Sequence, residues 1–310
     1  MIDTILQGDV REQLRKIPEG SIHTCITSPP YFGLRDYGMD GQIGLEETPE
    51  QFVESLVEVF REVKRVLRDD GTLWVNLGDS YAGSGKGQTR EGSKDPKRGK
   101  IDGMKLKNSS KGFTGIKPKD LIGIPWRVAL ALQADGWYLR QDIIWHKPNP
   151  MPESVTDRCT KAHEYVFLLS KSRDYYFDNE AIQEEAIHKE DPRAGYGRLH
   201  YRGKREGQEG TGQENFVSIK EKRNKRSVWS VTTKPFAGAH FATFPEKLIE
   251  PMVLAGCPVG GTVLDPFMGA GTTAVVAKKN GRNYLGTELN PAYIEIAEKR
   301  IQGVTSPLFT

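Results

Sequence analysis

A short loop near the start of the chain carries residues suited to holding a planar amine. The apolar run Ile22–Ile26 is typical of a buried strand and leads into Thr27-Ser28-Pro29-Pro30-Tyr31-Phe32. The prolines fix their own φ angles, bias Ser28 towards an extended backbone and leave carbonyls without competing N–H donors. Ser28 adds a hydroxyl oxygen and Tyr31 a flat ring. Acceptors beside a ring suit an exocyclic amino group on a planar base; the alternative is an ordinary Pro-Pro turn.

A glycine turn near the other end of the chain is the second candidate site. The apolar pair Val263-Leu264 leads into Asp265-Pro266-Phe267-Met268-Gly269-Ala270-Gly271, and a helix of small residues is predicted over 272–279. Glycine lets a backbone approach a ligand closely, and a helix N-terminus offers free N–H groups to a carboxylate or phosphate. A lone Gly-x-Gly also occurs in ordinary turns, so the order of the surrounding elements matters more.

An acidic residue follows this turn at the spacing of a ribose-binding carboxylate. A second strand is predicted over 283–287 and ends at Glu288, which lies 19 residues after Gly269. Nucleotide-binding α/β folds place such an acid about 20 residues further on, where it binds ribose hydroxyls. The full dinucleotide fingerprint is missing, because no third glycine stands three residues after Gly271. A compact adenosine cofactor therefore fits better than NAD.

Together the two motifs resemble those of the DNA amino-methyltransferases that use S-adenosyl-L-methionine. The resembling motifs are Thr-Ser-Pro-Pro-Tyr at 27–31 and Asp-Pro-Phe-x-Gly-x-Gly-Thr at 265–272. The catalytic motif comes before the cofactor motif, as in the circularly permuted β-group of this family. Further resemblances lie at Gly8-Asp9, 51–77, 144–150 and 240–245, so that roughly two thirds of the chain is covered.

The resemblance implies a division of roles, with no metal ion expected. Ser28, Pro29, Pro30 and Tyr31 would be catalytic and would grip the amine of an extruded base. The residues implied to bind the cofactor are Asp9, Phe241, Thr243, Phe244, Asp265, Phe267, Gly269, Gly271, Thr272 and Glu288. Three alternatives stay open, namely Asp9 as a helix cap and Phe241 and Phe244 as core aromatics.

Residues in the middle of the chain are candidates for the base pocket. Trp145, Lys147 and Pro150 resemble the base-pocket hairpin of the family, although Trp145 equally suits packing. Asn76 and Asp79 come at the end of an apolar strand and are candidates for lining the target pocket.

The resemblance favours cytosine N4 over adenine N6, because serine before Pro-Pro-Tyr is commoner in the cytosine enzymes. Methylation of a ring carbon needs a nucleophilic cysteine in a Pro-Cys loop, whereas Cys25 precedes the Pro-Pro loop and Cys257-Pro258 has the reverse order. An RNA or protein amine methyltransferase and a non-catalytic nucleotide-binding regulator are more distant alternatives. A restriction endonuclease is disfavoured, because no metal-binding carboxylate pair with a following lysine stands out.

Alternating strands and helices are predicted to position both motifs. Strands are predicted at 4–7, 22–26, 72–77, 138–146, 165–170, 263–264 and 283–287, and helices at 10–17, from Thr48 to a stop at Asp70-Gly71, and at 124–135, 244–254, 272–279 and 291–301. The fold class is α/β, a doubly wound, mostly parallel, seven-stranded-type sheet that is Rossmann-like and circularly permuted. Loops at the carboxyl ends of neighbouring strands share a crevice in such folds, so the two motifs should meet.

Two basic segments interrupt this pattern and predict a polyanionic partner. Residues 82–120 hold 11 Lys and Arg against 4 Asp and Glu, and residues 187–226 hold 11 against 6, although the net charge of the chain is only +3. Solvated loops are the alternative. The predicted partner is double-stranded DNA, with a cognate restriction endonuclease as a possible second partner; the oligomeric state is not predicted.

The predicted organisation follows from these segments. It comprises a catalytic half at 1–81, a basic flexible insertion at 82–120, a core continuation with the hairpin at 121–180, a target-recognition segment at 181–227 and a cofactor-binding half at 228–310.

Composition limits the cellular context that we expect. The three cysteines form no Cys-x-x-Cys pair, so neither a zinc site nor a disulfide framework is indicated. No apolar run approaches the roughly 18 residues of a membrane span, and the N-terminus lacks a signal-peptide pattern. We therefore expect a cytoplasmic protein that does not bind membranes.

Overall fold

The computed structural model describes residues 2–34, 36, 38–82, 116–186, 222–233 and 244–304. They belong to two compact units, a larger one of residues 1–178 and 227–310 and a smaller one of residues 179–226. In the smaller unit, the 3-10 helix η1 (Glu180–Ile182) precedes strand β6 (Glu184–Glu185), which pairs antiparallel with β7 (Lys222–Arg223). Glu184 forms ion pairs with Arg223 and Arg226, at 3.1 and 2.7 Å.

A mostly parallel sheet forms the centre of the larger unit. Among the described residues it has eight strands in the order β1-β10-β9-β2-β3-β5-β4-β8. Neighbours from β1 to β3 are parallel, β5 is antiparallel to β3 and β4, and the short edge strand β8 runs parallel to β4. The strands are β1 (Thr4–Gln7), β2 (Ile22–Thr27), β3 (Leu67–Leu77), β4 (Tyr138–His146), β5 (His163–Ser170), β8 (Val228–Ser230), β9 (Thr262–Asp265) and β10 (Asn283–Glu288).

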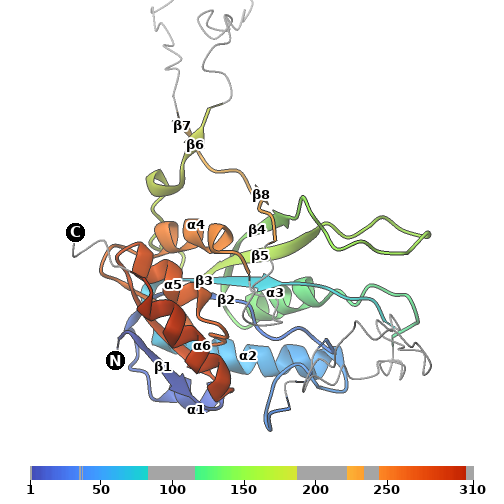
Figure 1. Cartoon of the computed structure of the whole chain (residues 1–310), viewed down its shortest axis with the longest axis horizontal. Helices are drawn as coiled ribbons and strands as arrows, with labels where there is room; N and C mark the ends of the chain where they lie inside the picture. Colours follow the sequence, from blue (N-terminus) through green and yellow to red (C-terminus); the bar gives the residue numbers. More distant parts are fainter. Residues whose placement is uncertain are drawn as a thin grey trace, which may run out of the picture. The chain divides into compact units, whose positions relative to one another are not determined.

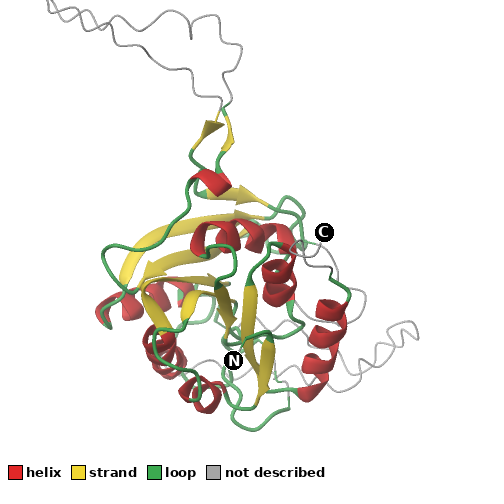
Figure 2. Cartoon of the chain, turned by 90° about the vertical axis from the view of Figure 1, so that its left-hand side faces the viewer, coloured by secondary structure: helices red, strands yellow, loops and turns green. Residues whose placement is uncertain are grey.

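Helices lie on both sides of the sheet (Figure 2). α1 packs on α2 and α2 on α3, while α4 packs on α5 and α5 on α6. The helices are α1 (Val10–Arg15), α2 (Pro49–Val66), α3 (Ile124–Ala134), α4 (Glu246–Gly256), α5 (Thr272–Lys279) and α6 (Pro291–Gln302). The predicted α/β class and doubly wound arrangement are confirmed, as is the antiparallel hairpin of β4 and β5.

The long helix α2 begins where its sequence predicts and ends earlier. Thr48 and Gln51 form a reciprocal capping box, and Pro49 occupies the first turn. The predicted stop at Asp70-Gly71 is wrong, because the helix ends at Val66 and both residues lie inside β3. Leu67 pairs with Ile22 of β2, so a contact with a distant strand takes the backbone out of the helix.

The two ends of the chain meet in one sheet. β1 pairs with β10 from Thr4 opposite Leu285 to Gln7 opposite Glu288. β2 pairs with β9, with Thr24 opposite Val263. The blue N-terminal strand β1 and the red C-terminal helix α6 lie side by side in Figure 1. The predicted meeting of the two motif-bearing halves is therefore observed.

A buried carboxylate ties β2, β9 and α5 together. Asp265 is 1% exposed and accepts hydrogen bonds from Thr27 Oγ1 at 2.6 Å, Thr273 Oγ1 at 2.7 Å and the Phe267 N–H at 3.0 Å. Burial raises the pKa of Asp265 to about 6, and the three donors oppose that shift. The carboxylate is thus a structural link between the two halves of the chain.

Part of the sequence analysis falls outside the described residues. Most of the basic segments 82–120 and 187–226 lies there, as do Phe241 and Thr243. In the part of the chain that the structure describes, no helix has the length and apolar character to cross a bilayer.

The raised pKa of Asp265 predicts a specific pH dependence of stability. The folded state keeps this proton up to about pH 6, whereas the unfolded chain loses it near the ordinary value of 3.8. The free energy of unfolding should therefore fall between about pH 4 and pH 6, relative to Asp265→Asn, by about 3 kcal/mol. Urea denaturation of both proteins across this range measures the difference. A difference that stays constant with pH would contradict the assignment.

Candidate functional site

A cavity of about 190 Å³ opens where four neighbouring parallel strands end. Its walls come from the segments that follow β1, β2 and β9 and from the end of β10, with additions from loops on either side. The lining residues are 8–10, 28–31, 34, 39, 41–43, 244, 266–270, 272, 287–290 and 293. Both motifs singled out in the sequence therefore contribute to one cavity.

The glycine turn packs closely against two neighbouring elements. Gly269 and Gly271 have φ angles of 50° and 76°, which favour glycine. A Cβ on Gly271 would lie 2.8 Å from the Cβ of Ala297, so this glycine serves the packing of α6. Gly269 lines the cavity and donates its N–H to Glu288 Oε2 at 2.8 Å.

Glu288 is the acidic residue best placed to receive hydroxyl donors in the cavity. Oε2 accepts from the Gly269 N–H and Oε1 from the Asn290 N–H, each at 2.8 Å. An ionised carboxylate has about four acceptor sites, so Glu288 keeps capacity for a further donor. Burial raises the pKa of Glu288 above its ordinary value, while the backbone N–H donors of Asn290, Gly269 and Leu289 oppose the shift.

Asp9 caps a helix and is also one of the residues that line the cavity. Its Oδ1 accepts from the N–H groups of Arg11 at 2.9 Å and Glu12 at 3.3 Å and so caps α1. Asp9 also lines the cavity from the segment between β1 and α1.

Two of the predicted cofactor-binding residues do not line the cavity. Asp265 turns its carboxylate inward to Thr27 and Thr273, and Gly271 packs on Ala297. Of the other predicted residues, those that line it are Asp9, Phe244, Phe267, Gly269, Thr272 and Glu288. Asp265 and Gly271 shape the turn, and the hydrogen-bond capacity of Asp265 is used within the fold.

The Pro-Pro loop forms a further wall of the cavity. Ser28, Pro29, Pro30 and Tyr31 all line the cavity. The loop is anchored by Phe32, which is buried with its ring centroid 5.5 Å from that of Phe52 on α2. The acceptor-rich Pro-Pro loop and the end of β10, where Glu288 lies, therefore line one cavity.

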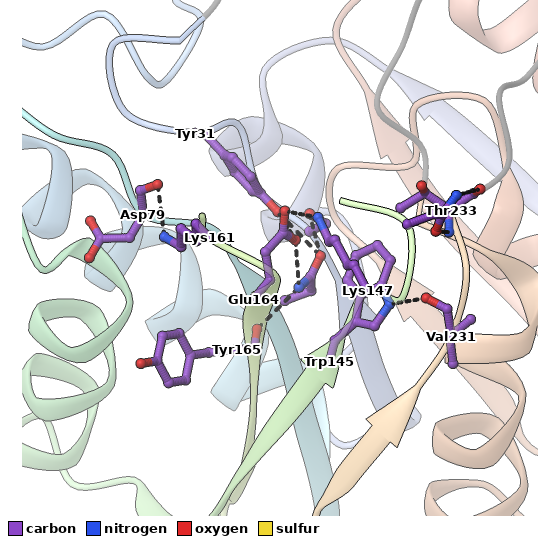
Figure 3. Close-up of polar contacts among 12 residues, drawn as sticks. Tyr31, Asp79, Trp145, Lys147, Lys161, Glu164, Tyr165, Val231 and Thr233 are labelled. Atoms are coloured by element: carbon purple, nitrogen blue, oxygen red, sulfur yellow. Dashed lines mark hydrogen bonds and ion pairs between the residues drawn. The ribbon is translucent and has the colours of Figure 1, made fainter. Parts of the chain in front are cut away.

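A polar cluster behind the loop was not predicted as a unit (Figure 3). The Tyr31 hydroxyl donates to Glu164 Oε2 at 2.8 Å, and Lys147 pairs with Glu164 Oε1. Asn76 accepts from Ser28 Oγ at 3.3 Å and donates to Glu164 Oε2 at 3.3 Å. Sequence analysis missed Glu164, although a charged residue beside the apolar run 165–169 was a usable signal.

Two other candidates for the base pocket, Asp79 and Trp145, form hydrogen bonds with backbone groups of the protein itself. Asp79 Oδ1 accepts from the N–H groups of Gly123 at 3.0 Å and Ile124 at 3.2 Å, so it caps the start of α3. Trp145 is buried, and its ring N–H donates to Val231 O at 2.9 Å. Neither residue lines the cavity, nor does Pro150. Within the described ranges, no cluster of three or more His, Cys, Asp or Glu side chains is arranged to hold a metal ion.

Comparisons with known proteins agree with this geometry. A family model described as DNA methylase matches residues 22–299. Type II methyltransferase M.Cfr9I of Citrobacter freundii is 50% identical over 300 residues, covering 97% of this chain and 88% of the relative.

Solved structures share the fold of the chain. PvuII DNA methyltransferase, named as cytosine-N4-specific, aligns with a TM-score of 0.65 at 19% identity, covering 98% of this chain and 89% of that chain. A putative DNA modification methylase from Thermus thermophilus, solved with S-adenosyl-L-methionine, aligns with a TM-score of 0.57 at 24% identity, covering 97% and 96%.

The packing of Tyr31 predicts a steric effect at Gly78. A Cβ on Gly78 would lie 2.4 Å from the Tyr31 ring, which its hydroxyl contacts hold in place. Gly78→Ala should therefore lower the free energy of unfolding by about 1–3 kcal/mol in chemical denaturation. Gly303→Ala is the matched control, since its Cβ would meet Arg300 O at an ordinary 3.5 Å. If Gly78→Ala costs as much in a Tyr31→Ala background, pressure on the ring is not the cause.

Proposed function

Because this chain belongs to the DNA methylase family, we propose that it is a site-specific DNA methyltransferase. It transfers a methyl group from S-adenosyl-L-methionine to the exocyclic amine of a flipped base, with cytosine N4 as the favoured target. The observation that supports this best is that the Pro-Pro loop and the glycine turn line the same cavity.

The residues around the glycine turn fit this cofactor. S-adenosyl-L-methionine supplies an electrophilic methyl group on a sulfonium. Glu288 keeps acceptor capacity for ribose hydroxyls, and Asp9 is assigned to the adenine side from β1. Phe244 and Phe267 offer aromatic walls, which pack against a flat base and attract a cation. Asp265 and Gly271 act indirectly by shaping the turn, and Phe241 and Thr243 keep their proposed cofactor roles.

The residues of the Pro-Pro loop orient the amine that is methylated. Methyl transfer from a sulfonium is an in-line displacement, so the protein mainly positions the reactants and excludes water. Ser28 Oγ and the Pro29 carbonyl accept the amine protons, which directs the nitrogen lone pair towards the methyl group. Tyr31 stacks on the extruded base, which contributes about 1–3 kcal/mol and offsets part of the cost of flipping.

Cytosine N4 is favoured as the target and adenine N6 is the alternative. Serine before Pro-Pro-Tyr resembles the cytosine enzymes, and the PvuII enzyme that shares the fold is named cytosine-N4-specific. RNA or protein amines are more distant alternatives, which the relatives named as Type II methyltransferases disfavour.

Double-stranded DNA is the proposed partner, contacted through the basic residues of 82–120 and 181–227. These segments divide the chain into the five parts predicted from the sequence. The name Type II methyltransferase, carried by the relatives, supports a cognate restriction endonuclease acting on the same site. A cytoplasmic location is part of this proposal.

Nucleoside analysis tests the proposed reaction. Purified protein incubated with isotopically labelled S-adenosyl-L-methionine and mixed-sequence duplex DNA should give N4-methylcytosine after digestion and mass spectrometry. Single-stranded RNA and enzyme-free DNA are the controls. N6-methyladenine without methylcytosine would move the target to adenine, and label in RNA or in protein alone would refute a DNA substrate.

The proposed role of Ser28 predicts a separation of turnover from cofactor binding. Ser28→Ala removes one acceptor for the amine, so turnover should fall about 5-fold to 150-fold. Cofactor affinity, measured by calorimetry, should change less than about twofold, since Glu288 and the glycine turn are untouched. Ser21→Ala, which removes an exposed hydroxyl that donates to Pro18 O, is the control. Equal losses of turnover and affinity would contradict the role.

A further inference from the structure

In the polar cluster behind the Pro-Pro loop, the donor and the acceptor of each hydrogen bond can be assigned from the neighbouring groups. Glu164, on β5, has a side chain only 15% exposed and pairs with Lys147, whose side chain is 19% exposed. Lys147 also lies over the Trp145 ring, 4.2 Å from its centroid. A carboxylate held beside an ammonium in this way is an acceptor and not a donor.

The orientation of the Asn76 amide follows from its neighbours. Asn76 is 5% exposed, and its nitrogen lies 3.1 Å from the Tyr165 carbonyl oxygen and 3.3 Å from Glu164 Oε2. Both neighbours only accept hydrogen bonds, so the amide nitrogen must face them. Asn76 Oδ1 is therefore the end that faces the Pro-Pro loop, at 3.3 Å from Ser28 Oγ.

The orientation of the amide in turn sets the direction of the Ser28 hydroxyl. Ser28 has one hydroxyl proton, and Asn76 Oδ1 accepts it. The Tyr31 hydroxyl, which also has one proton, directs it to Glu164 at 2.8 Å in preference to Asn76 at 3.3 Å. The Ser28 oxygen consequently turns its lone pairs, and not its proton, towards the cavity that it lines.

We propose that Glu164, held by Lys147 and acting through Asn76, is a positioning residue that makes Ser28 an acceptor towards the target base. This inference rests on the proposed function. The cluster would then help Ser28 to distinguish amino bases from carbonyl bases. Cytosine N4 and adenine N6 are hydrogen-bond donors, whereas thymine O4 and guanine O6 are acceptors. A carbonyl at the position of the target amine meets the Ser28 lone pairs and is rejected.

The Glu164→Gln variant tests whether Glu164 sets the direction of the Ser28 hydroxyl proton, because glutamine has almost the same shape as glutamate. The new amide places an N–H against Asn76 Nδ2 in place of an acceptor, so that the Tyr165 carbonyl is left to orient the Asn76 amide and the hold of Asn76 Oδ1 on the Ser28 proton is weakened. Turnover should fall about tenfold or more, while cofactor affinity stays within about twofold, because one charge-assisted contact is lost away from the cofactor. Glu164→Asp keeps the acceptor and should restore at least part of the turnover.

The preference for cytosine over uracil is a second measurement, which a purely structural role of Glu164 would leave unchanged. The binding affinities of each enzyme form for duplexes with cytosine or uracil at the methylated position are compared. The free energy of opening a given duplex is the same for every enzyme form, so it cancels when the preferences of the variants are compared. The preference for cytosine over uracil should fall about tenfold in Glu164→Gln and return in Glu164→Asp. Glu153→Gln is the matched control, since Glu153 pairs with Arg158 at 2.6 Å with the same 15% exposure.

The outcomes separate this inference from the proposed function. Wild-type protein that transfers no methyl group to DNA overturns both. Wild-type protein that methylates DNA, together with a Glu164→Gln variant of unchanged turnover and preference, overturns the inference alone. If Glu164→Gln does not fold, Asn76→Ala carries the same expectation, because it removes the acceptor of the Ser28 proton.

Discussion

The parallel pairing of β2 with β9 is the constraint on which the site depends. β2 carries the Pro-Pro loop and β9 the glycine turn, although the two strands are more than two hundred residues apart in the chain. Burying a carboxylate without hydrogen-bond partners costs free energy. Asp265 avoids this cost because it accepts hydrogen bonds from Thr27, Thr273 and Phe267. The two loops are therefore held together by backbone pairing and by one buried carboxylate that accepts three hydrogen bonds.

Two acids in the C-terminal part of the chain illustrate how position decides what a carboxylate contacts. Asp265 and Glu288 end adjacent parallel strands, and burial raises the pKa of both. Asp265 accepts from three donors within the fold and does not line the cavity, whereas Glu288 lines the cavity and accepts from backbone N–H groups that include those of Gly269 and Asn290. Residue type alone does not distinguish these roles; the direction of each side chain does.

Local signals explain what the sequence predicted well. The capping box at Thr48 and Gln51, the helix 272–279 and the strand ending at Glu288 depend on neighbours in sequence. Elements decided by distant contacts were harder to predict. α2 ends at Val66 because Leu67 pairs with β2, and Asp79 caps a helix that begins 45 residues later.

The contacts that join the polar cluster were not predicted, for the same reason. Asn76 lies in β3, Glu164 in β5 and Lys147 directly after β4, and the order of these strands in the sheet differs from their order in the chain. The resemblance of the motifs identified which loops matter, and the sheet determined which polar groups stand behind them.

A crystal structure of the protein with S-adenosyl-L-methionine and a duplex containing its methylation site tests the central claim most directly. The account predicts an extruded base whose amine contacts Ser28 Oγ and lies about 3–3.5 Å from the methyl carbon, with the ribose on Glu288. A cofactor bound outside this cavity, or a base left stacked in the duplex with its amine far from Ser28, would contradict it.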